Sequence, residues 1–202
     1  MGTLDHIAVS AGRLDAARAH VEASLGVAMG PGGRHAAMGT WNRLTGLDDG
    51  TYLEAIAVDP DAPSPPSARW FGLDDLEPHA APALRTWVVR VDDLDAALRA
   101  FPRSGRAVDL ARGDLRWRMG VPHDGRAAWE GSWPALIEWQ GTPPSFPATG
   151  LSLERLTLSH PQADGLRDAL ADLLDDPRVA VVGGPVGLET TIATPDGPRV
   201  LR

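Results

Sequence analysis

Two stretches that align without a gap set the architecture of this chain, LDHIAVSAGRLDAARA at residues 4–19 and LRTWVVRVDDLDAALRA at residues 84–100. An offset of 80 positions places Leu4 on Leu84 and the run LDAA at 14–17 on the same letters at 94–97. Each stretch opens with apolar residues typical of a strand, then passes through a polar turn into an Ala- and Leu-rich helix. The repeat therefore predicts two copies of one structural unit, with helices near 14–25 and 94–101.

Further strands are predicted after each helix. In the first unit, 39–47 and 51–58 are apolar runs joined by Asp48-Asp49-Gly50, and an Asp-Gly pair between such runs is a strong hairpin signal. In the second unit, the corresponding runs are 115–121 and 135–140. The resulting order in both units is strand, helix, strand, strand, strand (βαβββ).

A third, weaker copy begins at Leu153 with LERLTLSHPQADGLRDALADLL. The rest of the chain predicts two or three short strands separated by Gly-Gly-Pro and Asp-Gly-Pro turns. Pro-rich segments, DPDAPSPPSA at 59–68 and GTPPSFPATG at 141–150, follow the last strand of the first and second units. The predicted organisation is a first module at 1–60, a linker at 61–82, a second module at 83–141, a Pro-rich linker at 142–150 and a partial βαββ unit at 151–202.

Composition narrows the class of protein. A hydrophobic content of 43% over 202 residues is enough for a packed core, and a net charge of −8 argues against binding to nucleic acid or to an anionic membrane. Without cysteine, any metal would have to be held by His, Asp or Glu. No secretory signal pattern and no membrane-length apolar run occurs, so we expect a cytoplasmic protein.

The modules resemble the vicinal-oxygen-chelate superfamily (glyoxalase, bleomycin-resistance and dioxygenase proteins), and more narrowly its glyoxalase-like domain proteins. The resemblance rests on five stretches: LDHIAV at 4–9, PGGRHAAMGTWNRL at 31–44, TYLEAIAVDP at 51–60, DLRWRMGVP at 114–122 and ALIEWQG at 135–141. It covers residues 4 to 141 and implies an α+β fold in which βαβββ modules form a cup-shaped mixed sheet.

The resemblance also implies a site, because the first and last strands of each module of this superfamily supply inward-facing metal ligands. Carried over, the first module gives His6 and Glu54, and the second gives Thr86 and Glu138 at the matching positions. Thr86 is a poor metal ligand, so this sequence departs from full four-ligand coordination.

The residues themselves support part of this set. Glu54 and Glu138 each interrupt an apolar strand, where a carboxylate is costly unless it is paired or bound, although an edge strand with the carboxylate in water is the alternative. Taken on its own, His6 is more typical of a hydrogen-bonded structural histidine. One His with two carboxylates suits a divalent ion such as Zn, Fe, Mn or Ni, whereas a metal-free site would use one Glu as an acid or base.

Other polar residues are candidates for substrate binding. Arg34 and His35 follow two glycines that allow a sharp turn, and they could receive an anionic or carbonyl group, with a surface loop as the alternative. Thr40 and Asn42 share one face of a strand and could point into the cup, with ordinary backbone hydrogen bonding at the start of a strand as the alternative.

Arg116 and Arg118 flank Trp117 on a predicted strand, so both arginines lie on one face and the tryptophan on the other. An inward arginine pair would form a cationic spot for a carboxylate or phosphate, whereas an inward Trp117 would form an apolar wall. Strand parity leaves both arrangements open.

Two functions fit these features. The first is a metal-assisted enzyme of isomerase, lyase or dioxygenase type that acts on a small oxygen-rich molecule, with Glu54 or Glu138 moving a proton. The second is a non-catalytic protein that binds or sequesters a small molecule in the same cup. The third unit is expected either to cover a sheet edge or to build a homodimer.

Overall fold

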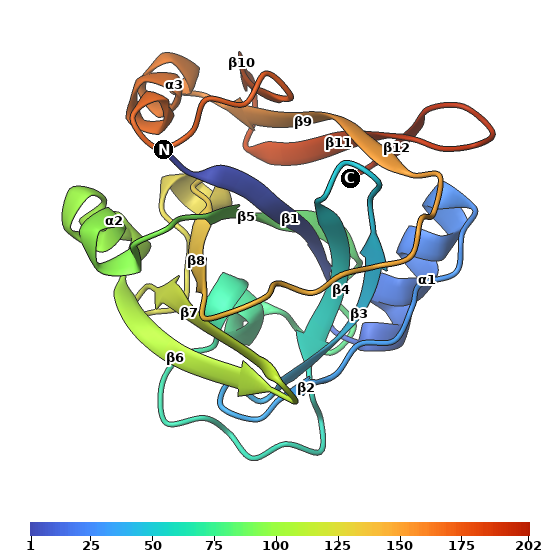
Figure 1. The fold of residues 1–202 in the computed structure, drawn as a ribbon, viewed down its shortest axis with the longest axis horizontal. Helices are drawn as coiled ribbons and strands as arrows, with labels where there is room; N and C mark the ends of the chain where they lie inside the picture. The colour runs from blue at the N-terminus through green and yellow to red at the C-terminus, as the bar shows by residue number, and fades with distance from the viewer.

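A curled eight-stranded sheet forms the centre of the computed structural model, which describes all 202 residues (Figure 1). The first module contributes β1 (Thr3–Ser10), α1 (Leu14–Leu25), β2 (Arg34–His35), β3 (Thr40–Gly46) and β4 (Tyr52–Val58). The second contributes β5 (Ala83–Arg90), α2 (Leu94–Ala100), β6 (Arg106–Arg112), β7 (Leu115–Val121) and β8 (Ala135–Trp139). Three short 3-10 helices complete these regions: η1 (Trp70–Asp75), η2 (Pro102–Ser104) and η3 (Trp129–Gly131). The βαβββ order predicted for both modules is confirmed.

The order of strands in the sheet is β2-β3-β4-β1-β5-β8-β7-β6. Within each module the first strand pairs in parallel with the last, β1 with β4 and β5 with β8, while β1 and β5 pair antiparallel at the centre. The two edge strands, β2 and β6, contact each other, so the sheet curls almost into a ring. Figure 1 looks into this ring and shows η1, in green, lying within it. The predicted cup-shaped mixed sheet is therefore confirmed.

The helices form where apolar residues recur at helical spacing. In α1 the buried residues are Leu14, Ala17, Val21 and Leu25, and Gly26 ends the helix in the left-handed conformation with φ 73°. In α2 the Asp93 side chain accepts a hydrogen bond of 2.8 Å from the Ala96 amide, which caps the helix. These short helices derive their stability from packing against the outer face of the sheet.

The C-terminal unit has one strand more than the predicted βαββ unit. Its elements are β9 (Ser152–His160), α3 (Ala163–Ala171), β10 (Val179–Gly183), β11 (Gly187–Ala193) and β12 (Arg199–Leu201). Of the two or three short strands predicted after the helix, three are present, and the last of them, β12, has only three residues and is defined by its pairing with β11. The strand order β10-β9-β11-β12 also differs from that of the modules, since β9 pairs in parallel with the next strand and not with the last.

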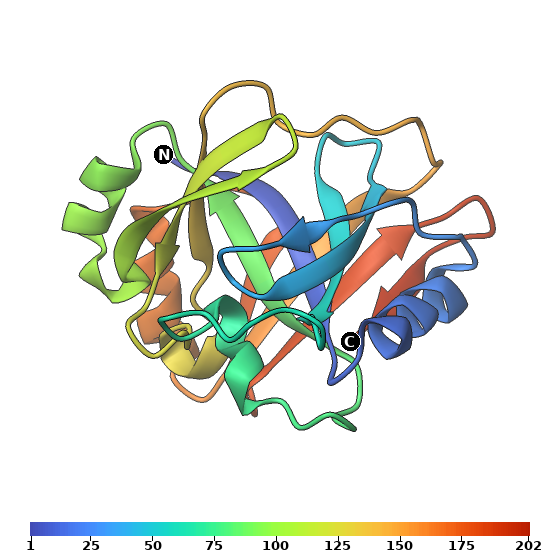
Figure 2. The same ribbon diagram turned by 90° about the horizontal axis from the view of Figure 1, so that it is seen from below.

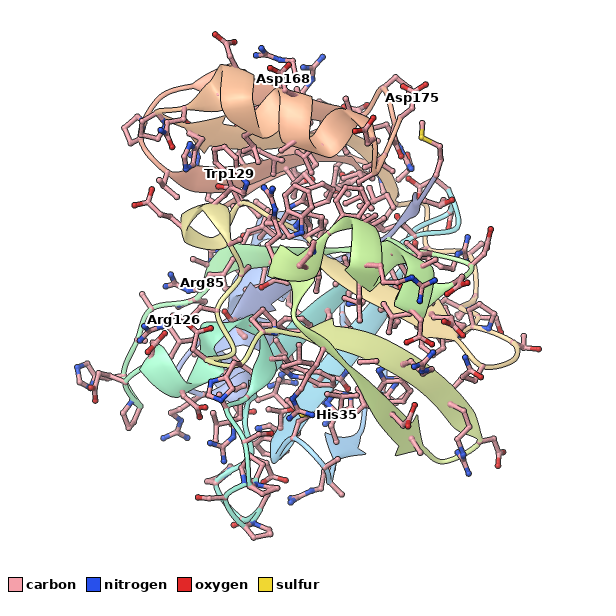
Figure 3. All side chains as sticks on the ribbon, turned by 90° about the vertical axis from the view of Figure 1, so that its left-hand side faces the viewer. His35, Arg85, Arg126, Trp129, Asp168 and Asp175 are labelled. Atoms are coloured by element: carbon pink, nitrogen blue, oxygen red, sulfur yellow. The ribbon has the colours of Figure 1, made fainter.

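The C-terminal unit packs on the outer face of the cup. In Figure 1 its strands cross above β1 and β5, and in Figure 2 α1 lies beside β12, which it contacts. Leu156 and Leu166 of this unit belong to the same buried cluster as Ile7 and Trp87 of the modules. Figure 3 shows Trp129 at the junction, beneath the C-terminal unit. A second buried cluster, which includes Trp117 and Met119, fills the inside of the cup.

The helices of this structure are all too short or too polar to cross a membrane.

The shared outer core predicts that the modules and the C-terminal unit unfold together. Leu156, which is 0% exposed, contributes to that core, so Leu156→Ala should lower the free energy of unfolding by about 2–5 kcal/mol. Urea denaturation followed by tryptophan fluorescence and by circular dichroism should give one coincident transition for both proteins. Val200→Ala, at a side chain 46% exposed, is the control and should change stability by less than about 0.5 kcal/mol. An early separate transition in Leu156→Ala would contradict the shared core.

Candidate functional site

A small cavity of about 30 Å³ lies inside the cup, with room for one or two water molecules. Its walls are chemically divided. The polar lining residues are His6, His35, Asn42, Tyr52, Glu54 and Arg112, all from the first module except Arg112. The apolar ones are Leu44, Trp70, Phe71, Trp117, Met119, Ile137 and Trp139, most of them from the second module and from η1. One module therefore supplies the reactive groups and the other an apolar wall.

A β-bulge in β1 brings two ionisable residues to the site. Leu4 pairs with Val89 and His6 with Val88, so Asp5 is an extra residue in β1 without a partner in β5. The bulge breaks strict alternation, and Asp5 lies beside His6 within the site. Its carboxylate accepts hydrogen bonds from His6 Nδ1 at 2.7 Å and from Trp139 Nε1 at 3.0 Å.

His6 lies between two carboxylates. Its Nε2 is 3.6 Å from Glu54 Oε2, on the side opposite the Asp5 contact, and both His6 and Glu54 are at most 5% exposed. The Tyr52 ring stacks on the imidazole at a centroid distance of 4.3 Å. Pairing explains how β1 and β4 present these groups together, because Ala8 lies opposite Glu54 in the parallel ladder and shares a sheet face with His6.

The two carboxylates hold His6 in its charged form. Burial alone lowers the pKa of His6, but the contacts with Asp5 and Glu54 outweigh burial and raise this pKa to about 9. Burial likewise raises the pKa of Asp5 and of Glu54, yet the interactions with His6 outweigh it and lower both values below normal. Near pH 7 the site therefore contains an imidazolium between two ionised carboxylates.

A second polar chain extends from Glu54 to the rim. Asn42 Nδ2 donates to Glu54 Oε1 at 2.6 Å, and Asn42 Oδ1 accepts from Arg112 Nη1 at 2.8 Å. His35 contacts Thr40 Oγ1 through Nδ1 at 3.0 Å and Arg112 Nη1 through Nε2 at 3.2 Å. Burial lowers the pKa of His35 to about 4, Glu54 opposes this only in part, and the cations Arg112 and His6 add to the lowering. His35 is thus a neutral acceptor, in contrast to His6.

Comparison with known proteins identifies the family. A family model described as a glyoxalase-like domain matches residues 4–174 of the chain. The chain belongs to the glyoxalase-like domain family. No curated protein matches it.

A solved structure shares the fold of this glyoxalase-like protein over most of its length. It is a hypothetical protein from Staphylococcus aureus, 13% identical, with a TM-score of 0.64 over 93% of this chain and 88% of that one. At lower structural similarity, methylmalonyl-CoA epimerase from Mycobacterium tuberculosis is 18% identical, with a TM-score of 0.43 over 70% and 89% of the two chains. A variant of the Streptomyces coelicolor methylmalonyl-CoA epimerase in complex with 2-nitronate-propionyl-CoA is 17% identical, with a TM-score of 0.45 over 70% and 100%.

The predicted placement of Glu138 beside Glu54 is wrong. Glu138 lies on the opposite face of the sheet, where its Oε2 accepts a hydrogen bond of 2.7 Å from the Leu94 amide at the start of α2. Ladder pairing shows why, since Ala8 pairs with Glu54 whereas Val88, the repeat counterpart of Ala8, pairs with Ala135. Ala135 and Glu138 are three residues apart, and an odd separation on a strand reverses the face.

Thr86 also lies outside the cavity of His6 and Glu54. It pairs with Ala8 in the antiparallel ladder, while Val88 occupies the place opposite His6. Thr86 instead lines a separate groove of about 460 Å³, whose walls come from the second module, the segment around η1 and the C-terminal unit. Phe71 lines both spaces and separates them. The repeat aligns His6 with Thr86 in sequence. Because β1 and β5 run in opposite directions, however, the two side chains lie at different positions along the sheet.

The predicted arginines face away from the cup. Arg34 forms ion pairs with Asp59 at 2.5 Å and with Asp61 at 3.3 Å near the surface. Arg118 pairs with Asp95 at 2.9 Å, and Arg116 donates to the Gly113 carbonyl at 2.6 Å. Of the two arrangements open for this strand, Trp117 faces inward and the arginine pair faces outward.

Three parts of the site have no clear signal in the sequence. Regular strand alternation would place Asp5 and His6 on opposite faces of β1, and the bulge between Leu4 and His6 is what brings them to the same side. Arg112 belongs to the far edge strand of the other module, whose approach to β2 depends on curling of the sheet. Trp70 and Phe71 lie in a segment predicted as linker, and Phe71 takes the left-handed conformation with φ 61°.

The residues present do not fit the divalent metal implied by the family. Of the predicted ligands only His6 and Glu54 converge, no group of three or more His, Asp or Glu side chains could hold an ion, and much of the remaining wall of the cavity is apolar. The Arg112 guanidinium and the protonated His6 add positive charge beside the same space. Protein metal sites of this kind need at least three ligands with lone pairs.

We expect His6 to remain protonated well above neutral pH. NMR titration of the imidazole should give a pKa near 9 in the wild type, and Asp5→Asn should move it down towards 6.5. Because the folded-state pKa is raised, the stability from this charge is fully present below about pH 6.5 and is lost as pH rises through about 9. Asp109→Asn, at an exposed carboxylate bonded to Arg118, is the control. Deprotonation of wild-type His6 near pH 6.5 would contradict the charged cluster.

We also expect no stoichiometric uptake of Zn²⁺, Mn²⁺, Ni²⁺ or Fe²⁺. Isothermal titration calorimetry on the purified chain, with metal content by mass spectrometry, measures this directly. The physical reason is that two converging ligands give a weak site next to two cations. Binding of one equivalent that disappears in Glu54→Gln would show that the donor set is sufficient after all.

Proposed function

We propose that this glyoxalase-like protein is a metal-independent acid–base enzyme of isomerase or lyase type, acting on a small carbonyl compound. The observation that carries the proposal is the contact between an ionised Glu54 and a protonated His6 at a largely apolar cavity. Such a pair can take a proton from carbon and stabilise the negative charge that develops on oxygen.

Glu54 is the proposed general base. Its Oε1 is held by Asn42, which leaves Oε2, the oxygen next to His6, to accept a proton from the carbon beside the substrate carbonyl. The electron pair of the broken C–H bond moves to the carbonyl oxygen and forms an enolate. Return of the proton to another face or another carbon completes an isomerisation, and departure of a neighbouring leaving group completes an elimination.

His6 is the proposed acid. The imidazolium donates a hydrogen bond to the carbonyl oxygen and stabilises the enolate, which removes the need for a metal as electrophile. Asp5 positions the ring and keeps it charged through the 2.7 Å contact at Nδ1. Trp117, Met119 and Ile137 exclude water on the other side, which strengthens these charge interactions.

A non-catalytic binding protein is the alternative function. The observation in its favour is the size of the cavity, because about 30 Å³ admits only a small group unless Trp70 and Phe71 move. The two functions differ in one measurable property, since a binding protein would hold its ligand without exchanging protons at carbon. A homodimer built through the C-terminal unit also stays a prediction.

Hydrogen–deuterium exchange tests the proposal. Small ketones, aldehydes and oxo acids are incubated with the protein in D₂O, and loss of the proton signal at the carbon next to the carbonyl is followed by NMR. Wild type should accelerate exchange in at least one compound class, and Glu54→Gln should lower that rate by about 10²–10⁴-fold. The rate should also fall as pH rises through about 9, where His6 loses its proton.

Glu138→Gln is the matched control, because this carboxylate lies on the other face of the sheet and caps α2. It should retain the exchange rate of the wild type. Binding of a compound without any exchange would favour the alternative function, and equal activity of wild type and Glu54→Gln would exclude Glu54 as the base.

A further inference from the structure

Arg112 reaches the site from the opposite module. It is the last residue of β6, yet its guanidinium contacts Asn42 and His35 of the first module because the edge strands β2 and β6 come together. Figure 3 shows His35 in the region where the strands of the first module meet the hairpin of β6 and β7. Closure of the cup is therefore what places a cation at this cavity.

The absence of a side chain at Gly33 makes room for the Arg112 side chain. A Cβ atom at position 33 would lie 2.6 Å from Arg112 Cδ and 3.3 Å from its Nε, so a larger residue would push the arginine aside. The glycine of the Gly32-Gly33-Arg34-His35 segment thus serves Arg112 as well as the local turn. The neighbouring Arg34, by contrast, is engaged with Asp59 and Asp61 outside the cup.

Arg112 has no acidic partner. Arg126 pairs with Asp75 at 2.6 Å and Arg178 with Asp176 at 2.6 Å, but no carboxylate lies within ion-pair distance of Arg112. Its two protein contacts, Asn42 Oδ1 and His35 Nε2, are neutral, and both are made by Nη1. The hydrogens on Nε and Nη2, which form a bidentate fork for carboxylates, have no protein acceptor.

We propose that Arg112 binds a carboxylate of the substrate, so that the substrate is a small oxo acid with an apolar tail. This deepens the proposed function and rests on it for the carbonyl group. The chain Arg112–Asn42–Glu54–His6 puts the cation and the proton-transfer pair on one polar side of the cavity, which suits a carboxylate close to a carbonyl. Trp117, Met119 and Trp139 form the apolar surface for the tail, and entry of the tail requires Trp70 and Phe71 to move aside, given the size of the cavity.

The test uses a charged and a neutral probe of the same shape. The probes are α-ketovalerate and the diketone in which an acetyl group replaces its carboxylate. Isothermal titration calorimetry should show that wild type binds the oxo acid at least about tenfold more tightly than the diketone. Arg112→Gln should lose this preference while binding of the diketone stays unchanged, and Arg112→Lys should restore part of it.

Arg106→Gln, at an exposed residue of the same strand, is the matched control and should keep the preference. Equal binding of the two probes by wild type, no binding of either, or a preference that survives Arg112→Gln in a folded protein would each overturn the inference. Proton exchange on the same samples separates the two proposals. Arginine-dependent binding without exchange would reject the acid–base enzyme but keep the carboxylate site. Exchange on the diketone alone would keep the acid–base enzyme but reject the carboxylate site.

Discussion

Antiparallel pairing of β1 with β5 organises the whole molecule. This pairing joins the modules into one sheet, leads to the meeting of the outer edges β2 and β6, and contains the bulge that exposes Asp5 to the site. Because the two strands are related as symmetric partners, His6 faces Val88 and not its repeat counterpart Thr86. A twofold repeat in sequence thus produces a one-sided site.

Burial of charge is the second main feature. Removing an ion from water costs several kcal/mol, and three ionised groups lie together at Asp5, His6 and Glu54. Mutual attraction and the hydrogen bonds from Asn42 and Trp139 offset that cost. The same interactions set the protonation states of the three groups. The cluster is therefore costly to bury, but it holds an acid and a base in the protonation states that proton transfer needs.

The two modules contribute different groups to the site. The first keeps the polar residues, while the second places Trp117, Met119, Ile137 and Trp139 against them and contributes a single cation, Arg112. The acidic residue of the second module that most resembles Glu54 in sequence instead caps a helix on the other side of the sheet. This division explains why a family fold associated with metal chemistry here surrounds a site with too few converging ligands.

The meeting of His6 with Glu54 was implied by the resemblance to the vicinal-oxygen-chelate superfamily. The module order and the hairpin at Asp48–Gly50 could be predicted from residue order alone, because apolar periodicity and an internal repeat report local structure directly. The same reasoning pointed to His35 and Asn42, which line the cavity. The roles of Asp5, Glu138 and Arg112 emerged only from the folded chain. Their roles depend on a bulge, a change of strand register and the closure of a curled sheet. Each of these depends on pairing between strands that are distant in sequence, so the spacing of residues along one strand cannot predict it.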